Sequence, residues 1–186
     1  MDSDLGEILT RWSVRLAVGC YLGRVLLDVA FGRSGRGMAA KRRLWTAGCV
    51  LYLLHVACAF TFFHNWSHAD AYRHTAEQTA AATGLNWGGG LYFNYAFTLL
   101  WVFDTVRWWL GGLTAPVRST AYFRLLHAVF AFMMINATIV FGPPIWRWLA
   151  PAVLAAFGFA YLARRRTWQR SRKDEALAEP RWNNDD

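Results

Sequence analysis

Residues 44–63 read LWTAGCVLYLLHVACAFTFF, a stretch without a single charged side chain. An α-helix of about 20 predominantly apolar residues crosses a bilayer core of about 30 Å, so this stretch predicts a transmembrane helix. Four runs of similar length and character accompany it, and together they predict an all-α integral membrane bundle of about five spans. The predicted spans are Trp12–Phe31, Leu44–Phe63, Leu91–Leu110, Tyr122–Phe141 and Ile145–Ala163.

The overall composition agrees with a membrane location. The 186 residues are 55% hydrophobic and 17% charged, whereas about 25% of the residues in a typical soluble domain are charged. The net charge of +8 does not indicate nucleic-acid binding, because the Lys and Arg residues stand between or beyond the apolar runs and not on one soluble face. Cys20, Cys49 and Cys58 lie inside the runs without a CxxC pair, which excludes a disulfide scaffold or a zinc ribbon.

The distribution of basic residues predicts the orientation of the spans, because cytoplasmic connections are enriched in Lys and Arg. Connections rich in Lys and Arg alternate with connections that have few of them. Residues 64–90, for example, have Arg73 as their only Lys or Arg residue. We therefore expect the N-terminus outside and the C-terminus in the cytoplasm, in a bacterial plasma (inner) membrane. The basic residues on the expected cytoplasmic side are Arg33, Arg36, Lys41, Arg42, Arg43, Arg107, Arg118, Arg124, Arg164, Arg165, Arg166, Arg170, Arg172 and Lys173.

The first run is the most polar of the five, because it contains Arg15, Arg24 and Asp28. It can also be interpreted as a buried or interfacial helix, which would leave four spans. Residues 1–163 are expected to form one transmembrane bundle. Residues 164–186 are basic and then acidic, and we expect them to end the last helix and continue as a poorly ordered cytoplasmic tail.

Two pairs of opposite charges fall within the predicted spans, where ionisable side chains are costly and are therefore candidate functional groups. Arg24 and Asp28 are four residues apart and share a helix face, and Asp104 and Arg107 are three apart. One interpretation joins all four into a network between the first and third spans, which would suit a proton or ion path. In the other, each pair neutralises itself and Arg107 extends to the lipid headgroups.

Two histidines, His55 and His127, lie within predicted spans among aliphatic and aromatic residues. Imidazoles from two neighbouring helices can ligate a b-type haem. Their depths in the membrane differ, however, because His55 lies about eleven residues and His127 about five residues from the cytoplasmic edge. An α-helix rises about 1.5 Å per residue, so the two imidazoles would be offset by several ångströms, which does not favour a shared haem. The alternative is that each histidine is a core residue hydrogen-bonded to a neighbouring helix.

The densest group of potential metal ligands follows the second span, where residues 64–74 read HNWSHADAYRH. His64 and His68 share one face if the helix is continuous, whereas His74 joins them only if the chain turns. Three imidazoles are sufficient to bind copper, zinc or iron. Asp70 is either a further ligand or a partner that orients an imidazole. The sequence thus predicts a metal site on the non-cytoplasmic face.

A second local pattern competes with the continuous helix. Ser67 followed by Asp70 resembles a capping box, and the segment after it is rich in Ala, Glu and Gln up to Gly84. This pattern predicts a short surface helix that begins at Ser67, between the second and third spans. The break would separate His64 from His68 and would allow His74 to approach His64.

Three consecutive glycines at 88–90 predict a tight re-entry of the chain into the membrane, because glycine adopts dihedral angles that other residues cannot. Polar residues of the next two spans are expected just below that surface, either lining a pocket at the outer mouth of the bundle or hydrogen-bonding between helices. The residues expected at this pocket are His64, Trp66, His68, Asn94, Tyr95 and Asn136.

Three functions remain open at this point. The first is a membrane metalloprotein that uses the outer histidines for metal handling or for metal-dependent chemistry. The second is a non-enzymatic accessory or scaffold subunit that contacts the lipid bilayer and other membrane subunits. The third is an electron carrier with haem between His55 and His127. The helical bundle itself does not discriminate among them.

Overall fold

The computed structural model describes residues 2–32, 37–112, 120–140, 142 and 145–178; Arg33, Arg36, Arg118 and residues 179–186 lie outside the described residues. Within these ranges the chain forms six α-helices and one π-helical turn, without strands. This confirms the predicted all-α class. The elements are α1 (Asp2–Phe31), α2 (Met38–Phe62), α3 (His68–Thr83), α4 (Gly90–Leu110), α5 (Thr120–Ile135), η1 (Asn136–Val140) and α6 (Ile145–Ala178).

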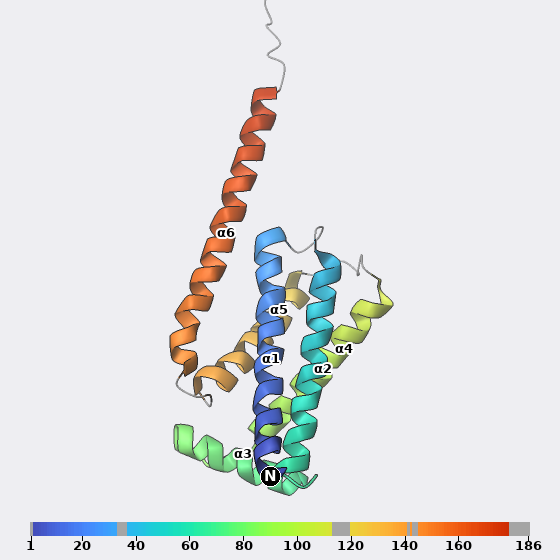
Figure 1. Cartoon of the computed structure of the whole chain (residues 1–186), viewed down its shortest axis with the longest axis vertical. Coiled ribbons are helices and arrows are strands. Elements are labelled where there is room, and N and C mark those ends of the chain that lie inside the picture. Colours follow the sequence, from blue (N-terminus) through green and yellow to red (C-terminus); the bar gives the residue numbers. More distant parts are fainter. Residues whose placement is uncertain (1, 33–36, 113–119, 141, 143–144, 179–186) are drawn as a thin grey trace, which may run out of the picture.

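The long helices run alternately up and down, as Figure 1 shows. Helices α1 and α2 pack against each other along their length, and α4 and α5 cross them obliquely. Helix α3 lies across the lower end of this bundle, next to the N-terminus. The start of α2, the end of α4 and the start of α5 lie at the opposite end. The described basic residues of these segments, such as Lys41, Arg107 and Arg124, are therefore gathered at one end of the molecule.

The core of the bundle is aromatic. Trp101 of α4 is completely buried, and its ring centroid lies 5.5 Å from those of Trp45 and Tyr52 on α2 and 4.8 Å from that of Phe130 on α5. Tilted and edge-to-face pairs at such distances are the favoured arrangements of aromatic rings. Gly48 allows α2 to approach this core closely, because a Cβ there would lie 2.8 Å from the Trp101 ring.

Helix α1 buries several polar side chains beside the apolar Ala17, Val18 and Tyr21, and it exposes several large apolar ones. Thr10, Ser13, Arg24 and Asp28 are buried. The opposite face exposes large apolar side chains at helical spacing. These are Leu5, Ile8, Leu9, Trp12 and Leu16. A soluble helix has the reverse pattern.

In the part of the chain that the structure describes, two helical segments are long and apolar enough to cross a membrane by length and composition, Met38–Phe62 and Thr120–Thr138. They correspond to the second and fourth predicted spans.

The sequence predicts that the last helix ends near Arg164 and that a poorly ordered tail follows; residues 179–186 of this tail lie outside the described residues. Helix α6 continues without a break from Ile145 to Ala178. It extends well beyond the other helices in Figure 1. Its contacts with the bundle are to α1 and η1, including a hydrogen bond of 3.4 Å from Arg164 Nη1 to the carbonyl oxygen of Val29. The described basic residues from Arg164 onward thus prolong α6 as a helix.

Candidate functional site

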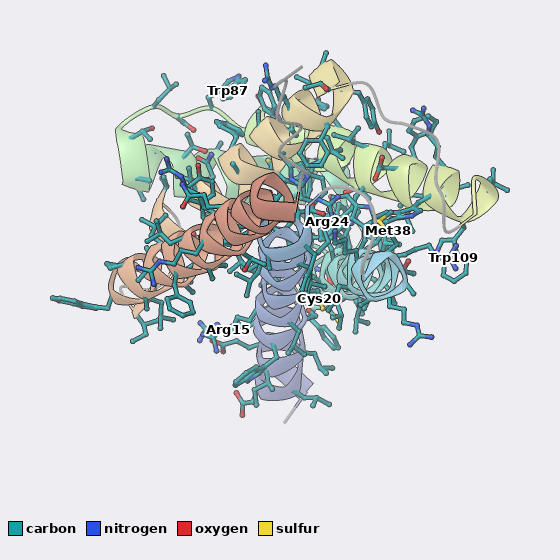
Figure 2. All side chains as sticks on the ribbon, turned by 90° about the horizontal axis from the view of Figure 1, so that it is seen from above. Arg15, Cys20, Arg24, Met38, Trp87 and Trp109 are labelled. Carbon is teal, nitrogen blue, oxygen red and sulfur yellow. The ribbon has the colours of Figure 1, made fainter. Side chains whose placement is uncertain are left out.

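A cluster of buried charges joins α1 to α2. Asp28 accepts ion pairs from Arg24 at 3.0 Å and from Lys41 at 3.1 Å. The side chains of Asp28, Arg24 and Lys41 are only 9%, 3% and 1% exposed. The predicted Arg24–Asp28 pair is therefore present, and it has a third member. Figure 2 shows Arg24 directed into the middle of the bundle, whereas Arg15 of the same helix points away.

Lys41 is the member that sequence reasoning missed, because its neighbours Arg42 and Arg43 make it look like part of a solvated basic connection. One signal was available. The buried positions of α2 are Lys41, Trp45, Gly48, Cys49, Tyr52 and Cys58. Lys41 continues this stripe one turn before Trp45, and its ammonium group also donates to the carbonyl oxygen of Gly32.

His127 of α5 is attached to the same cluster. Arg24 Nη1 contacts Nε2 of His127, and Tyr21 Oη lies 3.2 Å from Nδ1 of His127. Because a guanidinium group only donates, Nε2 must accept and Nδ1 carries the proton toward Tyr21. Both ring nitrogens of His127 are thus engaged by neighbouring side chains. His55 is hydrogen-bonded through Nδ1 to the carbonyl oxygen of Thr10 at 2.9 Å.

Asp104 and Arg107, the second predicted pair, both contact Tyr122 of α5. Asp104 is completely buried and accepts a hydrogen bond of 2.8 Å from Tyr122 Oη. The guanidinium group of Arg107 lies over the ring of the same tyrosine, 5.3 Å from its centroid. Tyr122 therefore bridges the two charged residues of α4 to the start of α5, and these groups act as contacts between helices.

At the opposite end of the bundle, the chain breaks between α2 and α3 as the capping pattern predicts. Ser67 is the N-cap of α3, and its side chain accepts a hydrogen bond of 3.2 Å from the Asp70 backbone NH. Gly84 ends the helix in the left-handed conformation, with φ of 78°. Asn65 and Trp66 also have positive φ, 46° and 57°, a conformation that is unfavourable for residues with a Cβ. This turn directs the chain from α2 into α3, which lies across the end of the bundle.

The break brings His64 and His74 together and separates both from His68. The ring centroids of His64 and His74 lie 5.3 Å apart. His68 instead pairs with Tyr95 of α4, whose Oη lies 3.1 Å from its Nδ1, and Asp70 accepts an ion pair of 2.8 Å from Arg73. Among the residues that the structure describes, no three His, Cys, Asp or Glu side chains form a group that could hold a metal ion.

The two neighbouring imidazoles affect each other electrostatically. Partial burial, and then the proximity of His74, lower the pKa of His64, while Asp70 raises it by a smaller amount. The net effect favours the neutral imidazole, which is the form that binds metals and accepts hydrogen bonds. Nε2 of His74 lies 2.9 Å from the Gln78 amide nitrogen one turn further along α3.

His64 and His74 lie at the edge of a cavity of about 670 Å³. Residues of α1, α2, α4 and α5, of the surface helix α3 and of the π-helical turn η1 line this cavity. Of the residues predicted at an outer pocket, His64, Asn94, Tyr95 and Asn136 line this cavity, whereas Trp66 and His68 do not appear among the lining residues. In α2 and the two residues after it, the lining residues recur at helical spacing, as Tyr52, His55, Val56, Ala59, Phe60, Phe63 and His64.

The cavity is lined mostly by apolar residues, and its polar and charged lining residues include Glu7, Thr10, Arg11 and His55. Near α3 its walls carry His64, His74, Gln78 and Asn94. Deeper in the bundle the lining is mostly aliphatic and aromatic, with Val14, Ala17, Val18, Tyr52, Phe97, Met133 and Met134. The site is therefore shaped for a molecule that has an apolar body and a polar head.

Two local features shape the mouth of this cavity. The π-helical turn η1 contributes Asn136, Ala137 and Val140 to the wall, and such turns often occur at functional sites. The glycines at 88–90 act differently from the prediction, since none of them has a positive φ. A Cβ on Gly88 would instead overlap the backbone oxygen of Tyr72. The glycine thus permits α3 to lie against the start of α4.

Comparison with family models, curated proteins and solved structures gave no match for this chain. The cavity and the side chains around it therefore carry the functional inference.

Proposed function

We propose that this chain is an integral membrane protein that binds an amphiphilic molecule in the cavity among α1, α2, α4 and α5. The observation that supports this proposal is a cavity of about 670 Å³, which has polar residues near α3 and a mostly apolar lining deeper in the bundle. Binding sites for small molecules usually measure about 300–1,000 Å³ and combine an apolar lining with a few polar groups that fix orientation.

The proposed membrane location has five spans, formed by α1, α2, α4, α5 with η1, and the first part of α6. The apolar outer face of α1 from Leu5 to Leu16 suits contact with lipid, where apolar side chains need no partner. The start of α2, the end of α4 and the start of α5 lie at one end of the bundle. These segments are basic, with Arg107 near the end of α4 and Arg124 near the start of α5, which supports a cytoplasmic location for that end. In this orientation α3 and the cavity mouth lie on the non-cytoplasmic side.

The proposed ligand has a hydrocarbon tail and a small polar head group, as a fatty acid or a short-chain lipid has. The hydrocarbon tail of the ligand would pack against the apolar side chains of Val14, Val56 and Met133, and it needs no polar partner there. The head group would lie among His64, Gln78 and Asn94, which offer imidazole and amide hydrogen-bonding atoms. An elongated amphiphile matches this division better than a compact polar substrate.

Filling the cavity tests this proposal directly. Ala59 lines the cavity from α2, and Ala59→Phe would place a phenyl ring in the apolar part. We expect organic extraction of the detergent-purified wild-type protein to yield about one amphiphile per chain by mass spectrometry, and at least a tenfold lower yield from Ala59→Phe. Ala156→Phe on the exposed face of α6 is the matched control and should retain the wild-type yield.

Equal yields from the two variants would contradict the proposal, because the extracted lipid would then come from the outer surface. An extract without a stoichiometric amphiphile from wild type, also after incubation with mixed bacterial lipids, would contradict it as well. Circular dichroism and gel filtration of both variants confirm that the comparison is made on folded protein.

A further inference from the structure

His64 and His74 come from different elements, yet they meet at one edge of the cavity. His64 directly follows α2 and His74 lies in the second turn of α3, and both line the cavity. Their rings are inclined by 60°, with centroids 5.3 Å apart. Because this pair lies at the polar end of the site, what it binds bears directly on the proposed function.

The separation of the rings is the one that a shared metal ion would require. An imidazole nitrogen binds Zn²⁺ at about 2.0–2.1 Å, which places the ring centre about 3.2 Å from the metal. At a tetrahedral angle two such ring centres lie about 5.2 Å apart, whereas a linear arrangement would separate them by about 6.4 Å. The observed 5.3 Å agrees with the tetrahedral value.

Local structure fixes the backbone beside His64 and holds the ring of His74. Trp66 NH donates to the carbonyl oxygen of Phe60 at 3.0 Å and Ser67 NH to that of His64 at 2.7 Å, which closes the left-handed turn beside His64. The Gln78 amide nitrogen donates to Nε2 of His74, so in this arrangement Nδ1 of His74 carries the ring proton. Zinc binding at Nδ1 requires the other tautomer, with the Gln78 amide turned so that its oxygen accepts from Nε2–H. Metal-binding histidines typically donate their second ring N–H to an acceptor in this way.

We propose that His64 and His74 together bind one Zn²⁺ ion at the polar end of the cavity, with an oxygen atom of the bound head group as a further ligand. This inference rests on the proposed function, because two protein ligands leave two positions of a tetrahedral ion for water or for the amphiphile. His68 takes no part, since its ring is turned to Tyr95. The head group would then be an oxygen donor such as a carboxylate or a phosphate.

The test uses the full chain in detergent, stripped with EDTA and titrated with Zn²⁺ alone in competition with a chromogenic chelator. Wild type should bind one Zn²⁺ per chain. His64→Ala and His74→Ala should each raise the Kd by more than 100-fold, and Gln78→Ala by roughly 10- to 100-fold. His68→Ala is the matched control, because it removes a neighbouring imidazole outside the pair, and it should leave the Kd unchanged.

Three results would overturn the inference. These are no stoichiometric Zn²⁺ binding by wild type, an equal loss in His68→Ala, and unchanged affinity in His64→Ala. Substitution with Co²⁺ adds a readout of geometry, and the visible spectrum should have the intense absorption of a tetrahedral ion. An octahedral Co²⁺ spectrum would contradict the tetrahedral pair.

The Ala59→Phe variant separates this inference from the proposed function. It fills the apolar part of the cavity and should still bind Zn²⁺ while it loses the amphiphile. Wild-type protein that carries the amphiphile but binds no Zn²⁺ would contradict only the metal site. Protein that binds Zn²⁺ through His64 and His74 but carries no amphiphile would contradict only the proposed function.

Discussion

Asp28→Ala should be among the most destabilising single substitutions in this chain. The carboxylate of Asp28 neutralises both Arg24 and Lys41, which are 3% and 1% exposed. Its removal leaves two buried cations without this counter-charge. Breaking a buried ion pair in this way costs about 3–5 kcal/mol, and we expect a loss of that size in the free energy of unfolding. Thermal unfolding of the detergent-purified protein, followed by circular dichroism, measures it.

Two further substitutions make this result specific. Lys41→Met keeps the Arg24–Asp28 pair and should cost clearly less than Asp28→Ala. Glu7 pairs with Arg11 on the same helix, but these side chains are 44% and 65% exposed, so Glu7→Ala should change stability by only about 0–1 kcal/mol. If Asp28→Ala is no more destabilising than Glu7→Ala, the buried cluster does not hold α1 and α2 together.

Trp101→Ala should cause a second large loss, about 3–5 kcal/mol. The completely buried indole ring contacts aromatic rings of α2 and α5, so its removal leaves a void where three helices meet. The same unfolding measurement applies. Trp101→Phe should cost much less, because the Nε1 donor of Trp101 has no hydrogen-bond partner in the described part of the chain and only volume is lost.

Trp148 provides the control for this prediction. It is 79% exposed on α6, and Trp148→Ala should therefore stay within about 0.5 kcal/mol of the wild type. A Trp101→Ala protein that unfolds at the temperature of Trp148→Ala would show that the aromatic cluster does not form the core.

The helices and several of their ends could be predicted because their signals are local. The run 44–63 is apolar throughout and forms most of α2, and Ser67 and Gly84 bound α3 as the capping pattern predicts. The Arg24–Asp28 pair followed from spacing alone. In each case the interacting residues are within one or two helical turns of each other.

The remaining features depend on contacts between segments that are far apart in the chain. Lys41 becomes buried only because α1 places Asp28 beside it. His127 can be assigned to Arg24 and Tyr21 only once α5 lies against α1. The histidine pairing depended on a left-handed turn at Asn65 and Trp66, and neither residue type requires that conformation. The cavity, which is enclosed by four helices, has no signature in any single segment.

Photo-crosslinking tests the central claim, that an amphiphile occupies the interior of this bundle. Protein in liposomes is incubated with a fatty acid that carries a diazirine on its acyl chain and is then irradiated, and the labelled residues are mapped by mass spectrometry. The cavity predicts labelling at lining residues of three helices, which an excess of unlabelled fatty acid suppresses. These residues are Val56, Ala59, Phe97, Thr98, Met133 and Met134. Labelling confined to outer residues such as Leu5, Trp12 and Leu154, without competition, would contradict the claim.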